Sequence, residues 1–177
     1  MAEADLELVK RAKAGDRSAF DELVGPLIGQ AFRLAFGMLH DRAAAEDAVQ
    51  EAAVRSWRKL NNLRPGNPLR PWFLAIVANQ CRRAMRDRWW SVLKRSDLTA
   101  LTQQVDAALV DEAETLRQGL LRLSVRDRLV VVLRYYLDLS FEEVAATLRV
   151  SPSAARVRAH RALARLRGII DIPEESA

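Results

Sequence analysis

Six arginines and no acidic residue lie between Val144 and Ile170. At helical spacing, most of these arginines share one arc of a helix that follows Ser151, and small or aliphatic side chains fill the opposite arc. Arginine can donate two hydrogen bonds to guanine or phosphate, and a valine within the basic arc can contact a thymine methyl group. Although a basic face can also be merely solvated, the arc favours DNA binding in the major groove by Arg156, Val157, Arg158, His160, Arg161 and Arg165.

The elements that position this arc are predicted to be two helices joined by a tight turn, over residues 139–167. Ser140 and Glu143 have the spacing of a capping box at the start of the first helix. Ser151 is a suitable N-cap for the second helix, and Pro152 suits its first turn because the N–H group that proline lacks has no partner there. The stretch is therefore predicted to be a helix-turn-helix.

A proline-rich loop and a basic helix form a second candidate nucleic-acid site. Residues 61–71 contain three prolines and one glycine, which disfavour a helix, and they carry Arg64 and Arg70. The helix predicted over residues 72–90 combines arginines with Trp89 and Trp90. Such a surface can hold phosphates while its aromatic rings stack on unpaired bases. The alternative interpretations are a plain connecting loop and two tryptophans in the core.

Composition and periodicity predict an all-α protein. Half of the 177 residues are hydrophobic, and the net charge of +5 favours a nucleic-acid partner over an acidic small molecule. Apolar residues recur at helical spacing and nowhere alternate as in a strand.

A single cysteine, Cys81, excludes an internal disulfide and favours a reducing compartment. Neither a secretion signal nor membrane insertion is expected, so the sequence favours a cytoplasmic protein.

An acidic stretch predicts a division into two small helical domains. Between Arg95 and Arg117 there are five acidic residues and no basic one. We expect an N-terminal domain over residues 1–92, an acidic linker over residues 93–113 and a C-terminal helix-turn-helix domain over residues 114–177.

Residues capable of catalysis do not form a recognisable set. His40 and His160 lie far apart in the sequence, and no zinc-binding, nucleophile or phosphate-loop motif occurs. Glu46, Asp47 and Glu51 could imitate a carboxylate cluster, but a solvated or partner-binding helix face is the simpler interpretation. No enzymatic activity, cofactor or bound metal is therefore expected.

Four stretches, in register along the chain, resemble bacterial RNA polymerase sigma factors of the extracytoplasmic-function (ECF) type. Residues 41–57 (DRAAAEDAVQEAAVRSW) resemble the main polymerase-binding helix of that family, and residues 72–82 (WFLAIVANQCR) resemble its promoter-melting helix. Residues 120–139 are similar to the stretch that precedes the family's C-terminal helix-turn-helix, and residues 140–167 are similar to that motif itself.

The resemblance implies binding to core RNA polymerase and promoter DNA, with an anti-sigma factor as a further partner. The basic arc would then read the −35 element as duplex. The polymerase interface is expected at Asp47, Gln50, Glu51 and Arg55. Recognition of the opened −10 element, including a flipped base, is expected at Leu63, Arg64, Asn79, Arg82, Arg83 and Arg86.

Two other classes of protein fit parts of the pattern. A one-component or response-type regulator could share the helix-turn-helix, but the N-terminal half shows neither a ligand-pocket signature nor a phospho-acceptor aspartate in a βα context. A helical adaptor or anti-sigma-like protein would leave the basic arc without a role.

Val157 stands where the sigma family commonly has serine, so one hydrogen bond to DNA is absent and an unusual −35 sequence is expected.

Overall fold

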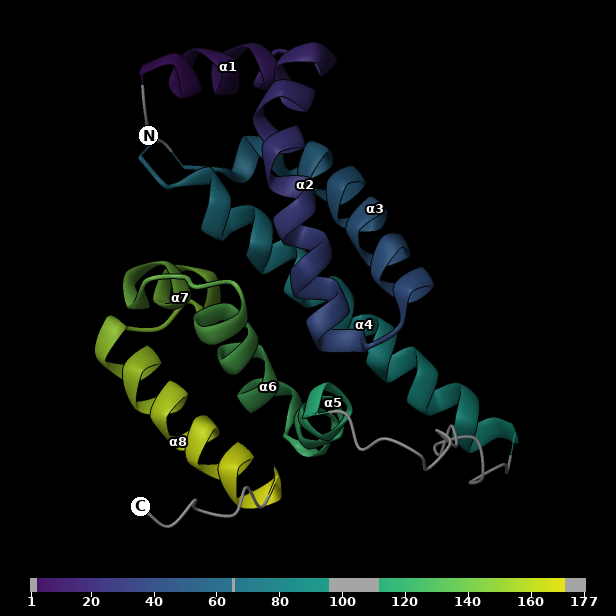
Figure 1. Ribbon diagram of the computed structural model, residues 1–177. Helices are drawn as coiled ribbons and strands as arrows, with labels where there is room; N and C mark the ends of the chain where they lie inside the picture. Colours follow the sequence, from purple (N-terminus) through teal and green to yellow (C-terminus); the bar gives the residue numbers. More distant parts are fainter. Residues whose placement is uncertain (1–2, 65, 96–111, 171–177) are drawn as a thin grey trace.

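The computed structural model describes residues 3–64, 66–95 and 112–170, with side chains for residues 6–64, 66–87 and 113–170. Within these ranges every regular element is a helix, which confirms the all-α prediction (Figure 1). Most of the predicted linker and the side chains of Trp89 and Trp90 lie outside them. The elements are α1 (Glu3–Lys13), α2 (Arg17–Leu39), α3 (Arg42–Lys59), the 3₁₀ turn η1 (Leu60–Asn62), α4 (Leu69–Arg95), α5 (Glu112–Arg122), α6 (Val125–Val131), the π-helical turn η3 (Val132–Tyr136), α7 (Phe141–Leu148) and α8 (Pro152–Ile170).

Helices α1–α4 form an N-terminal bundle in which α2 packs against the other three. Asp16 accepts a hydrogen bond from the Ala19 N–H at 3.1 Å, and Asp41 accepts one from the Ala44 N–H at 3.0 Å. Asp16 and Asp41 therefore cap the helices that follow them. Pro26 lies inside α2 without ending it.

The proline-rich segment is less extended than predicted. Residues Leu60–Asn62 form η1, and α4 begins at Leu69, so the expectation of a helix-free stretch over residues 61–71 is wrong at both ends. Pro71 is tolerated because it lies in the first turn of α4, where backbone N–H groups have no helical partner. The Lys13 ammonium group donates to the carbonyl oxygen of Leu63 at 2.7 Å, which ties α1 to the remaining loop.

The C-terminal half packs α5, α6 and α7 against α8. Ser124 caps α6, because its hydroxyl oxygen accepts a hydrogen bond from the Asp127 N–H at 3.1 Å. Tyr136 lies at helical spacing from the buried Leu129, Val132 and Leu133 and is nevertheless 54% exposed. The reason is the π-helical turn, closed by the hydrogen bond from the Leu137 N–H to the Val132 carbonyl. Such a turn holds an extra residue and shifts the register of the side chains that follow.

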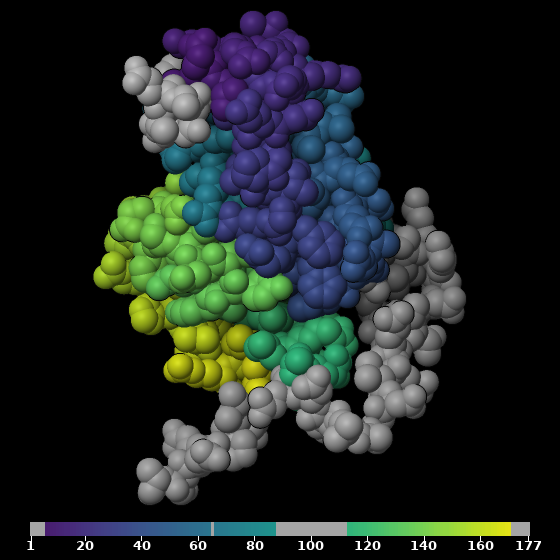
Figure 2. Space-filling view, turned by 45° about the horizontal axis from the view of Figure 1, so that its top comes forward, coloured from purple at the N-terminus to yellow at the C-terminus, as the bar shows by residue number. Residues whose placement is uncertain are grey.

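The two halves pack against each other along α2 and α4. Helix α4 contacts α7, and α2 contacts both α6 and η3, so the described part of the chain shares one apolar core. In Figure 2 the green C-terminal half lies directly against the blue N-terminal bundle. Gly37 permits a close approach of α2 to η3, since a Cβ atom at that position would lie 3.1 Å from Cγ1 of Val132. A larger residue at Gly37 would therefore push the halves apart.

Arg128 joins the ends of two helices across this contact and is only 7% exposed. Its guanidinium group donates to the carbonyl oxygen of Met38, near the end of α2, at 2.8 Å. It also donates to the carbonyls of Leu120 and Leu121, near the end of α5, at 2.8 and 2.7 Å. Burial lowers the pKa of Arg128, but a guanidinium stays protonated in proteins. Its charge stabilises the partial negative charge at both helix ends.

Candidate nucleic-acid interface

The predicted basic arc lies on the exposed side of α8. Val157, near its centre, is 48% exposed, while Ala155, Ala159 and Ala162 on the opposite side are fully buried. Helices α6 and α7 lie between α8 and the N-terminal bundle in Figure 1, so the bundle does not cover the arc. The charged or polar side chains exposed on it are those of Arg156, Arg158, His160, Arg161 and Arg165.

Local hydrogen bonds build the helix-turn-helix as predicted. The Ser140 hydroxyl accepts from the Glu143 N–H at 3.2 Å, and Oε2 of Glu143 accepts from the Ser140 N–H at 3.0 Å, which completes the capping box. Arg149 ends α7 with a φ of 56°, in the left-handed region. The Ser151 hydroxyl then accepts from the Ala154 N–H at 3.2 Å and starts α8. These contacts set the angle at which α8 is presented.

Two residues that no sequence motif indicated lie behind the arc, one in contact with Arg156 and the other in contact with the first. Phe141, the first residue of α7, holds the guanidinium carbon of Arg156 at 5.1 Å from its ring centroid. The guanidinium carbon of Arg134, in η3, lies 5.0 Å from the same centroid. The three residues belong to three different elements, so no local spacing relates them. The only sequence signal was an aromatic residue at the first position of a short helix, where a ring needs a tertiary partner.

Arg165 differs from the other arginines of the arc because it has a carboxylate partner. Its Nη1 atom lies 2.6 Å from Oδ2 of Asp127, whose side chain is 17% exposed. This ion pair joins α8 to α6. Among the described residues, no carboxylate lies within ion-pair distance of Arg156, Arg158 or Arg161. Those three side chains are therefore free to meet phosphate or base edges.

The residues expected at the −10 element divide between one face of α4 and the preceding loop. Arg82 donates to the Asn79 side-chain oxygen at 2.8 Å, which fixes the orientation of that amide and leaves its NH₂ group as the outward donor. Arg83 lies 3.6 Å from Asp87. Residues three or four positions apart are neighbours on a helix surface. One face of α4 therefore carries Asn79, Arg82, Arg83 and Arg86.

The two loop residues of this set lie in different environments. Arg64 is exposed, whereas the Leu63 side chain is 2% exposed and lies in the core. The Leu63 carbonyl is held by Lys13. Leu63 therefore contributes an anchored backbone to this surface, and its side chain holds the loop against the bundle.

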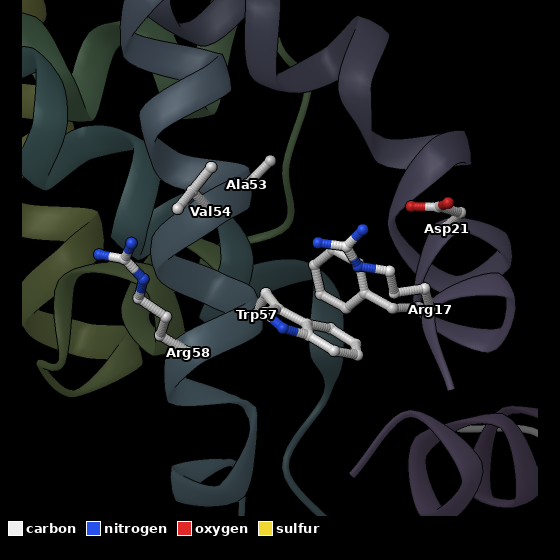
Figure 3. Close-up of a pocket in the computed structure, with 7 residues that line it drawn as sticks. Arg17, Asp21, Ala53, Val54, Trp57 and Arg58 are labelled. Atoms are coloured by element: carbon white, nitrogen blue, oxygen red, sulfur yellow. The ribbon is translucent and has the colours of Figure 1, made fainter. Parts of the chain in front are cut away.

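An exposed stripe along α3 contains the residues expected to bind polymerase. Asp47, Gln50 and Glu51 are exposed, and Arg55 donates to Glu51 at 2.7 Å. The stripe continues into a pocket of about 570 Å³ between α2 and α3 (Figure 3). The pocket is lined by Arg17, Phe20, Asp21, Ala53, Val54, Trp57 and Arg58.

Cys81 is buried, and burial raises the pKa of its thiol to about 12, which disfavours the reactive thiolate. Among the described residues, no three histidine, cysteine or acidic side chains are grouped so as to hold a metal ion. In the same part of the chain, no helix is long and apolar enough to cross a membrane.

The fold and its exposed surfaces define a helical DNA-binding protein with a C-terminal helix-turn-helix. Residues 23–91 match the sigma-70 region 2 family, and residues 113–166 match sigma-70 region 4. The chain is 32% identical to the RNA polymerase sigma factor CarQ of Myxococcus xanthus, over 92% of this chain and 95% of CarQ. It is 28% identical to the ECF RNA polymerase sigma factor SigW of Bacillus subtilis, over 90% and 92% of the two chains.

A solved structure shows the same fold. The structure of CnrH in complex with the cytosolic domain of CnrY matches with a TM-score of 0.71 and 28% identity, over 96% of this chain and 98% of CnrH. The chain belongs to the RNA polymerase sigma factors of the ECF group. It is a transcription initiation factor that acts with core RNA polymerase at promoters, and not an enzyme.

Proposed function

We propose that each of the three exposed surfaces binds a different partner during promoter-specific initiation. The arc on α8 reads the −35 element as duplex DNA, the Asn79 face of α4 with the Arg64 loop binds the opened −10 strand, and the α3 stripe docks on core polymerase. The domain that binds polymerase and the −10 element spans residues 1–92. An acidic linker over residues 93–113 connects it to the −35-reading domain, residues 114–177.

The observation that carries this assignment is the one-signed, uncovered arc of α8. Three of its arginines have no carboxylate partner among the described residues, and Val157 exposes an apolar surface between them. A face that is merely solvated gains nothing from an exposed valine, whereas a major groove offers a thymine methyl group to it. Arg161 and Arg156 then supply base or phosphate contacts.

The −10 assignment rests on the pairing of polar and basic groups on α4. The Asn79 amide is oriented by Arg82 at 2.8 Å and offers donors to the edge of a base. Arg83 and Arg86 lie about one and two turns further along from Asn79 and can hold the strand backbone. Extruding a base costs a few kcal/mol, so a rigid acceptor surface is required. The buried Leu63 side chain provides that rigidity to the neighbouring loop.

Simultaneous reading of both elements requires the two halves to separate. The −10 and −35 elements are centred about 25 base pairs apart, which is roughly 85 Å of B-form DNA. A compact chain of this length has a radius of gyration of about 16 Å. The packed arrangement of α4 on α7 is therefore a state of the free protein, and polymerase and DNA stabilise an opened one.

A partner that binds the packed arrangement would keep the protein inactive. The similar structure of CnrH contains the cytosolic domain of CnrY. We infer that this chain also binds a protein partner, that this partner is an anti-sigma factor, and that the chain works in the cytoplasm, where core polymerase and promoters are found.

The test is transcription by purified core polymerase on a library of promoter fragments, with and without this protein. New transcripts that share two sequence elements are expected.

Arg161→Ala should lower the preference for the best −35 sequence by about 1–3 kcal/mol if Arg161 contacts a base. The double variant Asp47→Arg with Glu51→Arg should lose polymerase binding. Tight binding to duplex DNA without polymerase, and no new transcripts, would point to a stand-alone regulator.

A further inference from the structure

The ring of Phe141 connects the recognition helix to the element that precedes the helix-turn-helix. The guanidinium carbons of Arg156 and Arg134 lie 5.1 and 5.0 Å from its centroid. Both distances are within the range at which a guanidinium is attracted to the face of an aromatic ring. One aromatic side chain therefore holds two arginines that belong to α8 and η3.

Arg134 is itself fixed, so the ring has a firm support. Its Nη1 atom donates to Oδ1 of Asp138 and to the carbonyl oxygen of Leu139, both at 3.1 Å. Asp138 has a φ of 51°, in the left-handed region, and its side chain is 94% exposed, so the Leu139 carbonyl is the more shielded of the two partners. The order of contacts is Asp138, Arg134, Phe141 and Arg156, and it runs from a carboxylate to the exposed arc of α8.

Arg156 has no competing attachment. Among the described residues, no carboxylate pairs with it, and its side chain is exposed. An exposed arginine without a partner samples many rotamers, and fixing such a side chain on binding carries an entropic cost. Contact with Phe141 restricts those rotamers before DNA arrives.

We propose that Phe141 is a positioning residue for −35 recognition, which holds the guanidinium of Arg156 in the orientation that meets the DNA. The proposal rests on the assignment of the α8 arc to the −35 element made above. Phe141 sharpens the choice of sequence because an oriented guanidinium donates two hydrogen bonds to guanine, whereas a mobile one serves mainly as a diffuse charge.

A purely structural role for Phe141 predicts a different outcome. Phe141 is half-buried against the core, so its loss could simply destabilise the C-terminal half. Such a loss would lower the melting temperature of the protein and reduce transcription from all promoters alike. A positioning role changes the ranking of −35 sequences while the folded protein, its charge and its polymerase binding are retained.

The experiment compares Phe141→Met with Phe141→Tyr and Phe141→Trp in holoenzyme assembled with core polymerase. Methionine keeps much of the apolar volume, and the two aromatic variants keep a ring. Tyr135→Leu is the matched control, because it removes an aromatic ring 5.9 Å from Arg134 and leaves Phe141 in place. Transcription is measured on promoters that vary only in the −35 element, and NMR records the ring-current shift of the Arg156 side-chain protons in the free chain.

Phe141→Met should abolish the ring-current shift and reduce discrimination between −35 sequences by about 2- to 5-fold, at the positions that Arg156→Ala affects. In Phe141→Met the slope of log DNA-binding affinity against log salt concentration should stay as in the wild type, because no charge is lost. Arg156→Ala should reduce this slope if Arg156 also meets a phosphate. Phe141→Tyr, Phe141→Trp and Tyr135→Leu should keep the wild-type ranking.

Two results would overturn the proposal in different ways. If Phe141→Met keeps the wild-type ranking while Arg156→Ala changes it, Phe141 is only structural and the −35 assignment stands. If Arg156→Ala and Arg161→Ala both leave the ranking unchanged, the assignment of the arc to the −35 element fails, and the proposal fails with it.

Discussion

Oε1 of Glu143 accepts a hydrogen bond from Nη1 of Arg70 at 2.8 Å, across the contact between the two halves of the protein. The other oxygen of the same carboxylate accepts from the Ser140 N–H and caps α7. Arg70 also donates to the side-chain oxygen of Gln30 at 2.8 Å. The first turn of the helix-turn-helix is thus attached directly to the start of α4, beside the residues proposed to bind the −10 element.

Breaking this ion pair should favour the opened protein. Arg70→Ala removes the interdomain contact and leaves the capping box intact. Both side chains are partly exposed, so the expected effect is about 0.2–1 kcal/mol, a modest rise in the opened population. Single-molecule energy transfer between dyes on α3 and α8 would measure it. Arg42→Ala, which breaks an ion pair within α3, is the control, and an equal effect from both variants would argue against the Arg70 contact.

Two glycines of α2 should respond in opposite directions to a larger residue. A Cβ atom at Gly29 would meet no atom of a neighbouring element within 4 Å, so Gly29→Ala should stabilise the protein by about 0.5–1 kcal/mol through helix propensity. A Cβ atom at Gly37 would lie 3.1 Å from Cγ1 of Val132 in the other half, so Gly37→Leu should separate the halves. Urea denaturation and small-angle scattering would measure both effects. A compact Gly37→Leu protein of unchanged stability would contradict this packing.

Arg128 should be difficult to replace, even by lysine. Arg128→Lys retains the charge, but one ammonium group cannot reach the carbonyls of Met38, Leu120 and Leu121 together. Unsatisfied buried carbonyls cost about 1–3 kcal/mol each when a partner is removed. Thermal melting should show losses for both Arg128→Lys and Arg128→Ala. Tolerance of lysine would mean that charge alone supports the two helix ends.

His40 should make stability depend on pH. Burial, aided by Arg128 and Arg117 and opposed by Glu114, lowers the pKa of His40 from 6.5 to about 4. The unfolded chain therefore binds a proton in a pH range where the folded protein does not, and stability falls as pH decreases from about 6.5 toward 4. Nε2 of His40 is buried without a hydrogen-bond partner among the described residues, which is consistent with a neutral ring.

Measurement between pH 6.5 and 5 isolates this effect, because the pKa of Glu114 is lowered to about 2 by its hydrogen bond with Arg117. His40→Asn should flatten the pH profile, since asparagine tolerates the left-handed φ of 51° at this position. An unchanged slope in the variant would assign the pH dependence to other groups.

Asn79→Ala should impair promoter opening more than polymerase binding. The variant removes the oriented amide but leaves Arg82, Arg83 and Arg86 to hold the strand. Permanganate footprinting of unpaired thymines would report opening, and a pull-down with core polymerase would report assembly. Loss of assembly with normal opening of the residual complex would refute the placement of Asn79 at the −10 element.

Local interactions made much of this protein predictable from its sequence. The caps at Asp16, Asp41, Ser124, Ser140 and Ser151, and the basic arc of α8, all involve residues three or four positions apart. Each such feature is complete within one helix and its cap, so spacing alone determines it. The same regularity underlies the four stretches that resemble sigma factors.

Only the tertiary structure decided which groups meet between elements. The burial of the Leu63 side chain and the pairing of Arg165 with Asp127 depend on helices that are distant in the sequence. So do the contact of Phe141 with Arg156 and the attachment of Glu143 to Arg70. These contacts depend on how whole helices pack, and a helical repeat specifies which face is apolar but not which neighbour covers it.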